Sequence, residues 1–136
     1  MSNIEQTLSI IKPDAVERNL QDKIKSEFIN NDFEIVEEKK IHISKDEAEI
    51  FYKVHESKPF YKDLCEYLSS GPIVVMRLQK DNAVLENRKL MGATNPKDAD
   101  DGTLRKKYGI SIDKNSVHGS DSVENAKIEL DFFFKD

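Results

Sequence analysis

The first third of the chain has a pattern of apolar and polar residues that predicts a strand followed by a helix. Residues 7–13, TLSIIKP, alternate and then end at a proline, as a strand does where it runs into a turn. Apolar residues then recur at helical spacing, at Leu20, Ile24 and Phe28. We therefore expect one helix over residues 14–31, ending where Asn31 or Asp32 accepts the left-handed conformation that commonly closes a helix.

The next segment predicts a second strand and a capped helix. Residues 33–43, FEIVEEKKIHI, have apolar residues at alternate positions near both ends, as in a strand with one solvent-facing side. Ser44 and Glu47 have the spacing of a capping box, in which each side chain bonds the other residue's backbone amide. A helix over residues 45–54 should follow.

The middle of the chain predicts a helix, a buried strand and a further helix. Pro59 should open a helix over residues 60–70, which a Gly-Pro pair then ends. Residues 73–78, IVVMRL, give the strongest signal for a buried strand. Asp81 is expected to cap a helix that ends near Gly92.

The last part of the chain combines a long polar loop with short elements. Residues 93–103 are dense in turn residues and acids, and a long loop without core residues is often functional. A turn at residues 104–108 and a brief strand at residues 116–118 should follow. A final helix is predicted by apolar residues at helical spacing, at Val123, Ala126, Leu130 and Phe134.

In this order the elements predict an α+β protein with a ferredoxin-like βαββαβ sandwich. Two helices would cover one face of a four-stranded antiparallel sheet. The chain has 136 residues, the length of one domain, and no repeat interrupts it. We therefore expect residues 1–136 to form a single domain.

Charge and cysteine content narrow the class of protein. Lys and Arg number 21 against 26 Asp and Glu, and the net charge of -5 disfavours a general nucleic-acid-binding surface. Cys65 is the only cysteine, which excludes an internal disulfide. The first residues do not resemble a signal peptide, and no apolar run approaches the about 20 residues of a membrane span. The sequence therefore predicts a cytoplasmic protein that binds neither membranes nor nucleic acid.

The three histidines, His42, His55 and His118, have none of the spacings that predict a zinc site. His118 differs from the other two because a brief strand delivers it to a turn of small and polar residues, Gly119, Ser120 and Asp121. From the residues alone, His118 could be a loop residue without chemistry, a metal ligand, an acid or base, or a nucleophile.

A bound phosphate would have to be held by side chains, because the glycines form none of the glycine-rich phosphate motifs. Arginine suits phosphate because its planar fork donates two parallel charge-assisted bonds, whereas lysine offers a point charge. The candidates are Lys12, Arg88, Thr94 and Arg105, with Phe60 as an aromatic ring that could stack on a base. Taken singly, each of them is better explained as an ordinary surface or core residue.

Several segments together resemble the nucleoside diphosphate kinase family, and the resemblance runs nearly end to end. The similar segments are TLSIIKPDAVERN, FYKVHESKPFYKDL, SGPIVVM, NRKLMGATNP, GTLR and NSVHGSDS. That family transfers the terminal phosphoryl group of a nucleoside triphosphate to a nucleoside diphosphate, by a ping-pong route through a phosphohistidine that needs Mg2+. The resemblance implies this activity, which maintains NTP and dNTP pools, with His118 as the nucleophile.

The resemblance also implies roles around that histidine. Glu129 would bond the other ring nitrogen, with Ser120 bridging, and Tyr52 would lie close to the transferred group. Asp121 would meet Mg2+ through water, while phosphates supply the remaining ligands that the octahedral preference of Mg2+ allows.

The nucleotide contacts implied by the resemblance come from other segments. The phosphates would be bound by Lys12, His55, Arg88, Thr94 and Arg105, and the ribose hydroxyls by Lys12 and Asn115. The base would stack on Phe60 and contact Leu64 and Ile112. Stacking reads the face of a ring more than its edges, so tolerance of different bases, as in ATP and GTP, is expected.

The chain departs from the family at a few positions but retains every carried-over residue. Glycine is common in the family where Asp22 and Asp32 stand, and Lys106 and Lys107 follow Arg105 in place of the usual pattern. A nucleotide-sensing or scaffolding domain without turnover, and a regulatory interaction protein, are the alternative classes. The intact set of residues disfavours the first, and the acidic net charge leaves the second unsupported. The resemblance further implies a homo-oligomer, a hexamer more than a tetramer.

Overall fold

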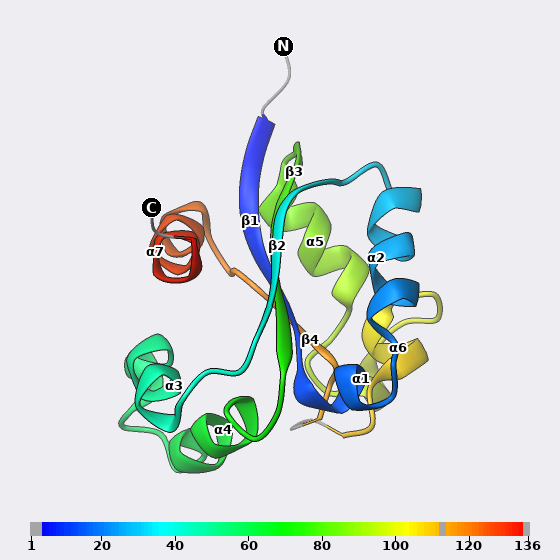
Figure 1. Ribbon diagram of the computed structural model, residues 1–136. Helices are drawn as coiled ribbons and strands as arrows, with labels where there is room; N and C mark the ends of the chain where they lie inside the picture. Colours follow the sequence, from blue (N-terminus) through cyan, green and yellow to red (C-terminus); the bar gives the residue numbers. More distant parts are fainter. Residues whose placement is uncertain (1–3, 112–113, 135–136) are drawn as a thin grey trace.

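A four-stranded antiparallel sheet organises the molecule, as the computed structural model shows for residues 4–111 and 114–134. The strands are β1 (Ile4–Ile11), β2 (Glu34–Ile41), β3 (Ile73–Asp81) and β4 (Val117–Gly119). Their order is β2-β3-β1-β4, so β1 and β3 are central (Figure 1). This is the strand order of a βαββαβ ferredoxin-like sandwich, and the predicted α+β fold is confirmed.

Helices cover both faces of this sheet, where the sequence predicted two helices on one face. The helices are α1 (Pro13–Glu17), α2 (Gln21–Asn30), α3 (Lys45–Phe51), α4 (Tyr61–Leu68), α5 (Ala83–Met91), α6 (Leu104–Tyr108) and α7 (Val123–Phe133), with single 3-10 turns at Lys53–His55 and Pro96–Asp98. In Figure 1, α1, α2, α5 and α6 lie on one side of the sheet, and α3, α4 and α7 lie on the other. None of the helices in residues 4–111 and 114–134 is long and apolar enough to cross a lipid bilayer.

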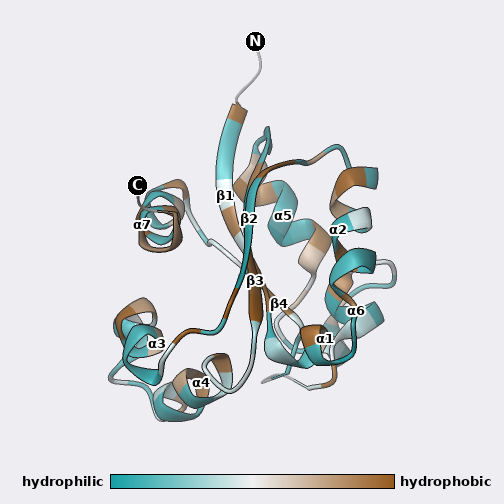
Figure 2. Ribbon diagram, viewed as in Figure 1, coloured by the Kyte–Doolittle hydropathy of each residue, from teal (hydrophilic) through white to brown (hydrophobic). Residues whose placement is uncertain are grey.

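The two helical layers enclose two hydrophobic cores, one against each face of the sheet. Alternate residues of β3 serve different cores: Met76 packs with Phe28 and Leu104, whereas Val75 packs with Leu8 and Leu68. A strand buried on both faces needs apolar residues at consecutive positions, which explains the unbroken apolar run in β3 (Figure 2). Cys65 is a free thiol buried in the second of these cores.

The prediction of a single helix over residues 14–31 is wrong, because this segment forms two helices, α1 and α2. Asn19 takes a left-handed conformation with φ of 59°. The amide of Leu20 donates to the carbonyl of Ala15, and the amide of Asn19 donates to that of Val16. This pair of bonds ends a helix as a Schellman motif does, so the apolar spacing continued across a helix boundary.

Two other helix ends agree with the predictions, and one helix start does not. Asp32, with φ of 68°, closes α2, and Gly92, with φ of 84°, closes α5. The capping box is present, since Ser44 Oγ accepts from the amide of Glu47 and the Glu47 carboxylate accepts from the amide of Ser44. Asp81 does not cap α5: it is the last residue of β3, and left-handed Asn82 precedes the helix.

Smaller differences between the predicted and the observed elements concern where each helix or strand begins and ends. The helix expected over residues 45–54 ends at Phe51 and continues as a 3-10 turn, and the helix after Pro59 begins at Tyr61. A β-bulge between Ile35 and Glu37 interrupts β2, which accounts for alternation only near the ends of its sequence. The brief strand expected at residues 116–118 is β4, one residue later.

Replacing aspartate by glycine should have opposite effects on the free energy of unfolding at Asp22 and at Asp32. Asp32→Gly should raise the free energy of unfolding by about 0.5 kcal/mol, because glycine accepts a positive φ without steric cost. Asp22→Gly should lower it by about 1 kcal/mol, because Asp22 lies in the first turn of α2. Urea denaturation of both variants measures the difference, and changes of equal sign would contradict the assignment of Asp32 as the helix-closing residue.

Candidate active site

His118 lies on β4 beside the central strand β1, directly opposite Ile10. Its Nε2 is 3.2 Å from Glu129 Oε1, and Ser120 Oγ donates to the same carboxylate oxygen at 2.8 Å. A ring nitrogen facing a carboxylate carries the proton, so the other nitrogen, Nδ1, holds a free lone pair. Nδ1 makes no hydrogen bond to any residue in the described part of the chain, and the side chain is 21% exposed. Glu129 therefore fixes one ring nitrogen of His118, and the other nitrogen keeps its lone pair.

Glu129 reaches His118 because α7 packs on the sheet through its apolar side. Ala126, Leu130 and Phe133 of α7 are buried, and the helix begins with Ser122 Oγ accepting from the amide of Asn125. Ser120 is fully buried, and its hydroxyl also accepts from the amide of Leu8 at 3.4 Å. The predicted grouping of His118, Ser120 and Glu129 is therefore present in the structure.

Aromatic rings form a wall around the imidazole. Phe51 lies edge-on to His118 with ring centroids 5.3 Å apart, and Tyr52 lies edge-on at 6.3 Å. Phe51 also contacts Phe133 at 5.2 Å, so this ring links α3, α7 and β4. Burial, and then the carboxylate of Glu129, raises the pKa of Tyr52, which therefore stays protonated. Sequence reasoning placed Tyr52 here but missed Phe51, whose packing no local pattern indicates.

Lys12, Asn115 and Thr94 form a second group, next to the end of β1. Lys12 is only 5% exposed, and its Nζ donates to Asn115 Oδ1 at 2.9 Å. Asn115 is buried as well, and its Nδ2 donates to the carbonyl oxygen of Thr94 at 3.1 Å. A buried ammonium beside the side-chain amide of Asn115 suits an oxygen-rich ligand, because burial strengthens each charge-assisted bond.

Two arginines approach from α5 and α6. Arg105 is largely buried and donates from Nη1 to the carbonyl of Gly92 and from Nη2 to that of Val117, each at 3.0 Å. Burial, and then the nearby positive charge of Arg88, lowers the pKa of Arg105 to about 10. Arg88 Nη1 donates to the carbonyl of Asp121 at 3.3 Å. Two neighbouring guanidinium groups repel each other because both are positively charged. An anion between them would stabilise both charges.

His55, Phe60 and Leu64 line the approach from α4 and the 3-10 turn before it. The ring of His55 lies between those of Tyr52 and Phe60, at 6.2 and 6.0 Å. Burial, and then the charge of Lys58, lowers the pKa of His55, which favours its neutral form. Phe60 is 46% exposed and Leu64 is half-buried, so both can contact a flat ligand. Ile112, the remaining expected base contact, lies outside the described residues.

Asp121 is the expected contact to Mg2+, and it is exposed in the turn after β4. Its Oδ1 accepts from Asn125 Nδ2 at 2.6 Å. The described residues contain no group of three or more His, Cys, Asp or Glu that could hold a metal ion. A site with one accessible carboxylate fits an Mg2+ ion that takes most of its oxygen ligands from phosphates.

Gly119, next to His118, allows α5 to approach β4 closely. A Cβ atom at this position would overlap Asn87 Nδ2 and would lie 2.7 Å from Met91 Cε. The small residue next to His118 therefore makes room for side chains of α5. The departures at Lys106 and Lys107 lie on α6, where Lys107 Nζ pairs with Glu27 Oε2 at 2.5 Å and joins α6 to α2.

Comparisons with known proteins assign this chain to a family of phosphotransferases. The sequence model described as "NDK: Nucleoside diphosphate kinase" matches residues 5–136. A nucleoside diphosphate kinase of Campylobacter jejuni is 58% identical over 132 residues, covering 97% of this chain and 96% of that protein. One from Geotalea daltonii is 53% identical over 131 residues, covering 96% of both chains.

Solved structures agree with the sequence comparison. The nucleoside diphosphate kinase of Aquifex aeolicus superimposes with a TM-score of 0.96 at 36% identity, covering 97% of this chain and 96% of that chain. The enzyme from Encephalitozoon cuniculi gives a TM-score of 0.94 at 37% identity, covering 97% and 90%. The chain belongs to the nucleoside diphosphate kinase family and has the phosphotransferase activity of that family in nucleotide metabolism.

The close approach at Gly119 can be tested with one methyl group. Gly119→Ala should lower the free energy of unfolding by about 1–3 kcal/mol and reduce kinase activity, because the buried side chains of Asn87 and Met91 must shift to make room for a methyl group next to His118. Urea denaturation and a steady-state kinase assay measure both effects. Gly71→Ala is the control, since its Cβ would meet only Pro13 Cβ at 3.7 Å. Parental activity in Gly119→Ala would contradict the tight packing at β4.

Proposed function

We propose that His118 Nδ1 carries the phosphoryl group during the kinase reaction. The observation that supports this role is the contact of Nε2 with Glu129, which leaves Nδ1 as the nitrogen with a free lone pair. In the first half-reaction the Nδ1 lone pair attacks the terminal phosphorus of a nucleoside triphosphate. The bond to the bridging oxygen breaks, and its electron pair leaves with the diphosphate. The positive charge that develops on the imidazole is stabilised by Glu129.

The second half-reaction reverses these steps with a different acceptor. A terminal oxygen of another nucleoside diphosphate attacks the phosphorus, the P–N bond breaks, and its electron pair returns to Nδ1. The proton on Nε2 stays on that nitrogen throughout, because Glu129 and Ser120 hold the ring in one orientation. One histidine therefore serves both half-reactions in a ping-pong cycle.

The nucleotide would bind with its phosphates toward His118 and its base toward the surface. Phosphate oxygens are assigned to Arg88, Arg105, Thr94, His55 and Lys12, and the ribose hydroxyls to Lys12 and Asn115. Phe60 would stack on the base, with Leu64 and Ile112 beside it. Since stacking does not read the edges of a base, ATP, GTP and the other triphosphates, with their deoxy forms, should all be substrates. Tyr52 would lie next to the transferred group.

Mg2+ would be bound mainly by the phosphates, with Asp121 as a water-mediated contact. When bound, the ion neutralises charge on the phosphate oxygens. Asp121→Ala should then raise the Mg2+ concentration needed for half-maximal activity, and an unchanged Mg2+ dependence would exclude a role for Asp121.

The remaining proposals concern the protein as a whole. We propose that residues 1–136 act as one kinase domain, that the protein works on the cytoplasmic nucleotide pool, and that it assembles as a homo-oligomer. A hexamer is favoured over a tetramer, and analytical ultracentrifugation distinguishes the two masses. A nucleotide-sensing domain without turnover is the alternative, and it would bind nucleotide without forming a phosphoenzyme.

A labelling experiment tests the proposed carrier directly. The protein is incubated with triphosphate labelled at its terminal phosphate, freed of nucleotide, and examined for acid-labile, base-stable label. His118→Ala should abolish this label because no other group replaces Nδ1, while nucleotide binding persists. His42→Ala is the control, since His42 lies on the surface and its Nε2 contacts the carbonyl of Ser69. Label that persists in His118→Ala, or label that an added diphosphate does not remove, would refute the proposal.

The role of Glu129 can be separated from its packing by an isosteric change. Glu129→Gln should slow phosphoryl transfer by about tenfold, because the imidazole loses a charge-assisted hydrogen bond. Rapid-quench measurement of phosphoenzyme formation gives the rate, and circular dichroism confirms the fold. Glu124→Gln, an exposed position at the start of the same helix, should keep the parental rate. Equal rates for both variants would remove Glu129 from the mechanism.

A further inference from the structure

The residue between Asn115 and Val117 has an unusual backbone conformation. Ser116 has φ of 72°, and the amide of Val117 donates to the carbonyl of Asn115 at 2.9 Å. A bond across three residues with a positive φ at the centre defines a γ-turn of the rare, strained kind. Side chains other than glycine seldom adopt it, and such strain persists only where surrounding contacts hold it.

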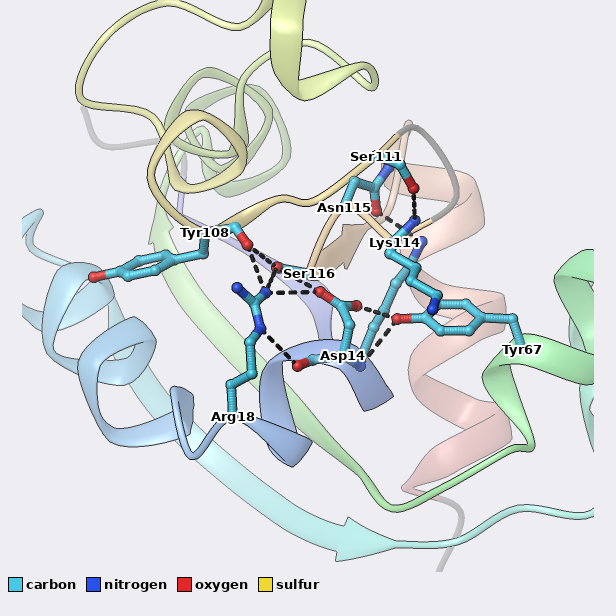
Figure 3. A network of polar contacts seen from close by, with 9 residues as sticks. Asp14, Arg18, Tyr67, Tyr108, Ser111, Lys114, Asn115 and Ser116 are labelled. Carbon is cyan, nitrogen blue, oxygen red and sulfur yellow. Dashed lines mark hydrogen bonds and ion pairs between the residues drawn. The ribbon is translucent and has the colours of Figure 1, made fainter.

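The side chain of Ser116 is fully buried in a network of polar contacts, which Figure 3 shows. Its hydroxyl lies 2.8 Å from Asp14 Oδ2 and 3.0 Å from the carbonyl oxygen of Tyr108, and it accepts from Arg18 Nη2 at 3.1 Å. One hydroxyl has one proton to donate, and the charged carboxylate of Asp14 is the stronger acceptor. The strained residue is therefore fastened by its own side chain.

Asp14 is itself held from three directions, although its side chain is almost fully buried. Arg18 Nη2 pairs with Oδ2 at 3.0 Å, and the hydroxyl of Tyr67 donates to Oδ1. The same hydroxyl accepts from the backbone amide of Asp14 at 2.9 Å. Burial and the hydrogen bond to Asp14 raise the pKa of Tyr67, so Tyr67 remains a donor. A buried carboxylate with all its partners in place is a rigid point of attachment.

The γ-turn connects directly to the groups assigned to the nucleotide. The amide of Lys12 donates to the carbonyl of Ser116 at 2.8 Å, while Lys12 Nζ donates to Asn115 Oδ1 at 2.9 Å. His118 follows two residues later on β4. The conformation of Ser116 thus sets the direction of the chain between Asn115 and His118.

We propose that Ser116 and Asp14 are positioning residues for phosphoryl transfer, and that their hydrogen bond holds the γ-turn that aligns Asn115 with His118. This inference rests on the roles proposed above for His118, Lys12 and Asn115. Neither residue contacts the reacting atoms; both act through the turn.

Two substitutions of Ser116 separate this role from ordinary packing. Alanine removes the hydroxyl but keeps the steric penalty of a positive φ, so the turn should relax. Glycine also removes the hydroxyl but adopts a positive φ without penalty, so the turn should survive. A residue that only filled space would behave in the opposite way, because glycine leaves the larger cavity.

The experiment compares Ser116→Ala, Ser116→Gly and Ser9→Ala in the full-length enzyme. Ser9 is the matched control: it is a fully buried serine opposite Gly119, and its hydroxyl has no partner among the described residues. Rapid-quench phosphoenzyme formation and calorimetric binding of ADP are measured, with urea denaturation to record stability. Ser116→Ala should slow phosphoenzyme formation by about tenfold and weaken ADP binding. Ser116→Gly should stay within about threefold of the parent, and Ser9→Ala should match it.

A double-mutant cycle tests the part played by Asp14. Asp14→Asn should slow transfer in the parent but have a smaller effect in the Ser116→Gly background, because the hydroxyl that Asp14 holds is then missing. Equal effects in both backgrounds would remove Asp14 from the proposal.

The outcomes also distinguish a failure of the proposed positioning role of Ser116 from a failure of the proposed carrier role of His118. If Ser116→Gly is as impaired as Ser116→Ala in both measurements, or if neither is impaired, the positioning role is wrong. If the parent forms no acid-labile label, the proposed role of His118 is wrong, and ADP binding by the same variants still decides the role of the turn at Asn115.

Discussion

The pairing of β4 with β1 is the contact on which the active site depends. β1 ends at Ile11, which is followed by Lys12, and its residue Ile10 lies opposite His118. The ammonium and the imidazole therefore share one rigid support, although they come from opposite ends of the chain. The helices on the two sheet faces complete the site, since α7 brings Glu129 from one side and α5 brings Arg88 from the other.

The parts of this arrangement that depend on neighbouring residues were predictable from the sequence. The capping box at Ser44 and the left-handed Asp32 follow from interactions within a few residues. The buried strand β3 was also predictable, because its apolar residues are consecutive in the sequence. The resemblance of several motifs predicted a set of site residues. The structure brings seven of them together around the end of β1: His118, Glu129, Ser120, Tyr52, Lys12, Asn115 and Thr94.

The parts that depend on distant partners could not be predicted. Helical spacing continued across Asn19, because the apolar face of α1 and α2 packs on the same core even though the helix stops between them. Phe51 contacts His118 through the fold alone, and nothing near it in sequence indicates that contact. Ser116 stands beside Asn115 in a recognisable motif, yet the meaning of its hydroxyl becomes visible only when Asp14 is placed next to it.

The distance along the chain between β1 and β4 has a consequence for how the enzyme is made. Leu8 and Ser120, which share a hydrogen bond, are 112 residues apart. During synthesis the amino-terminal elements emerge first, so β1 can pair with β3 long before β4 exists. Until then one edge of β1 stays open, and loop closure over such a span is slow. Closing the sheet and placing His118 are therefore the same late event, and an incomplete nascent chain lacks the residue proposed above as the phosphoryl carrier.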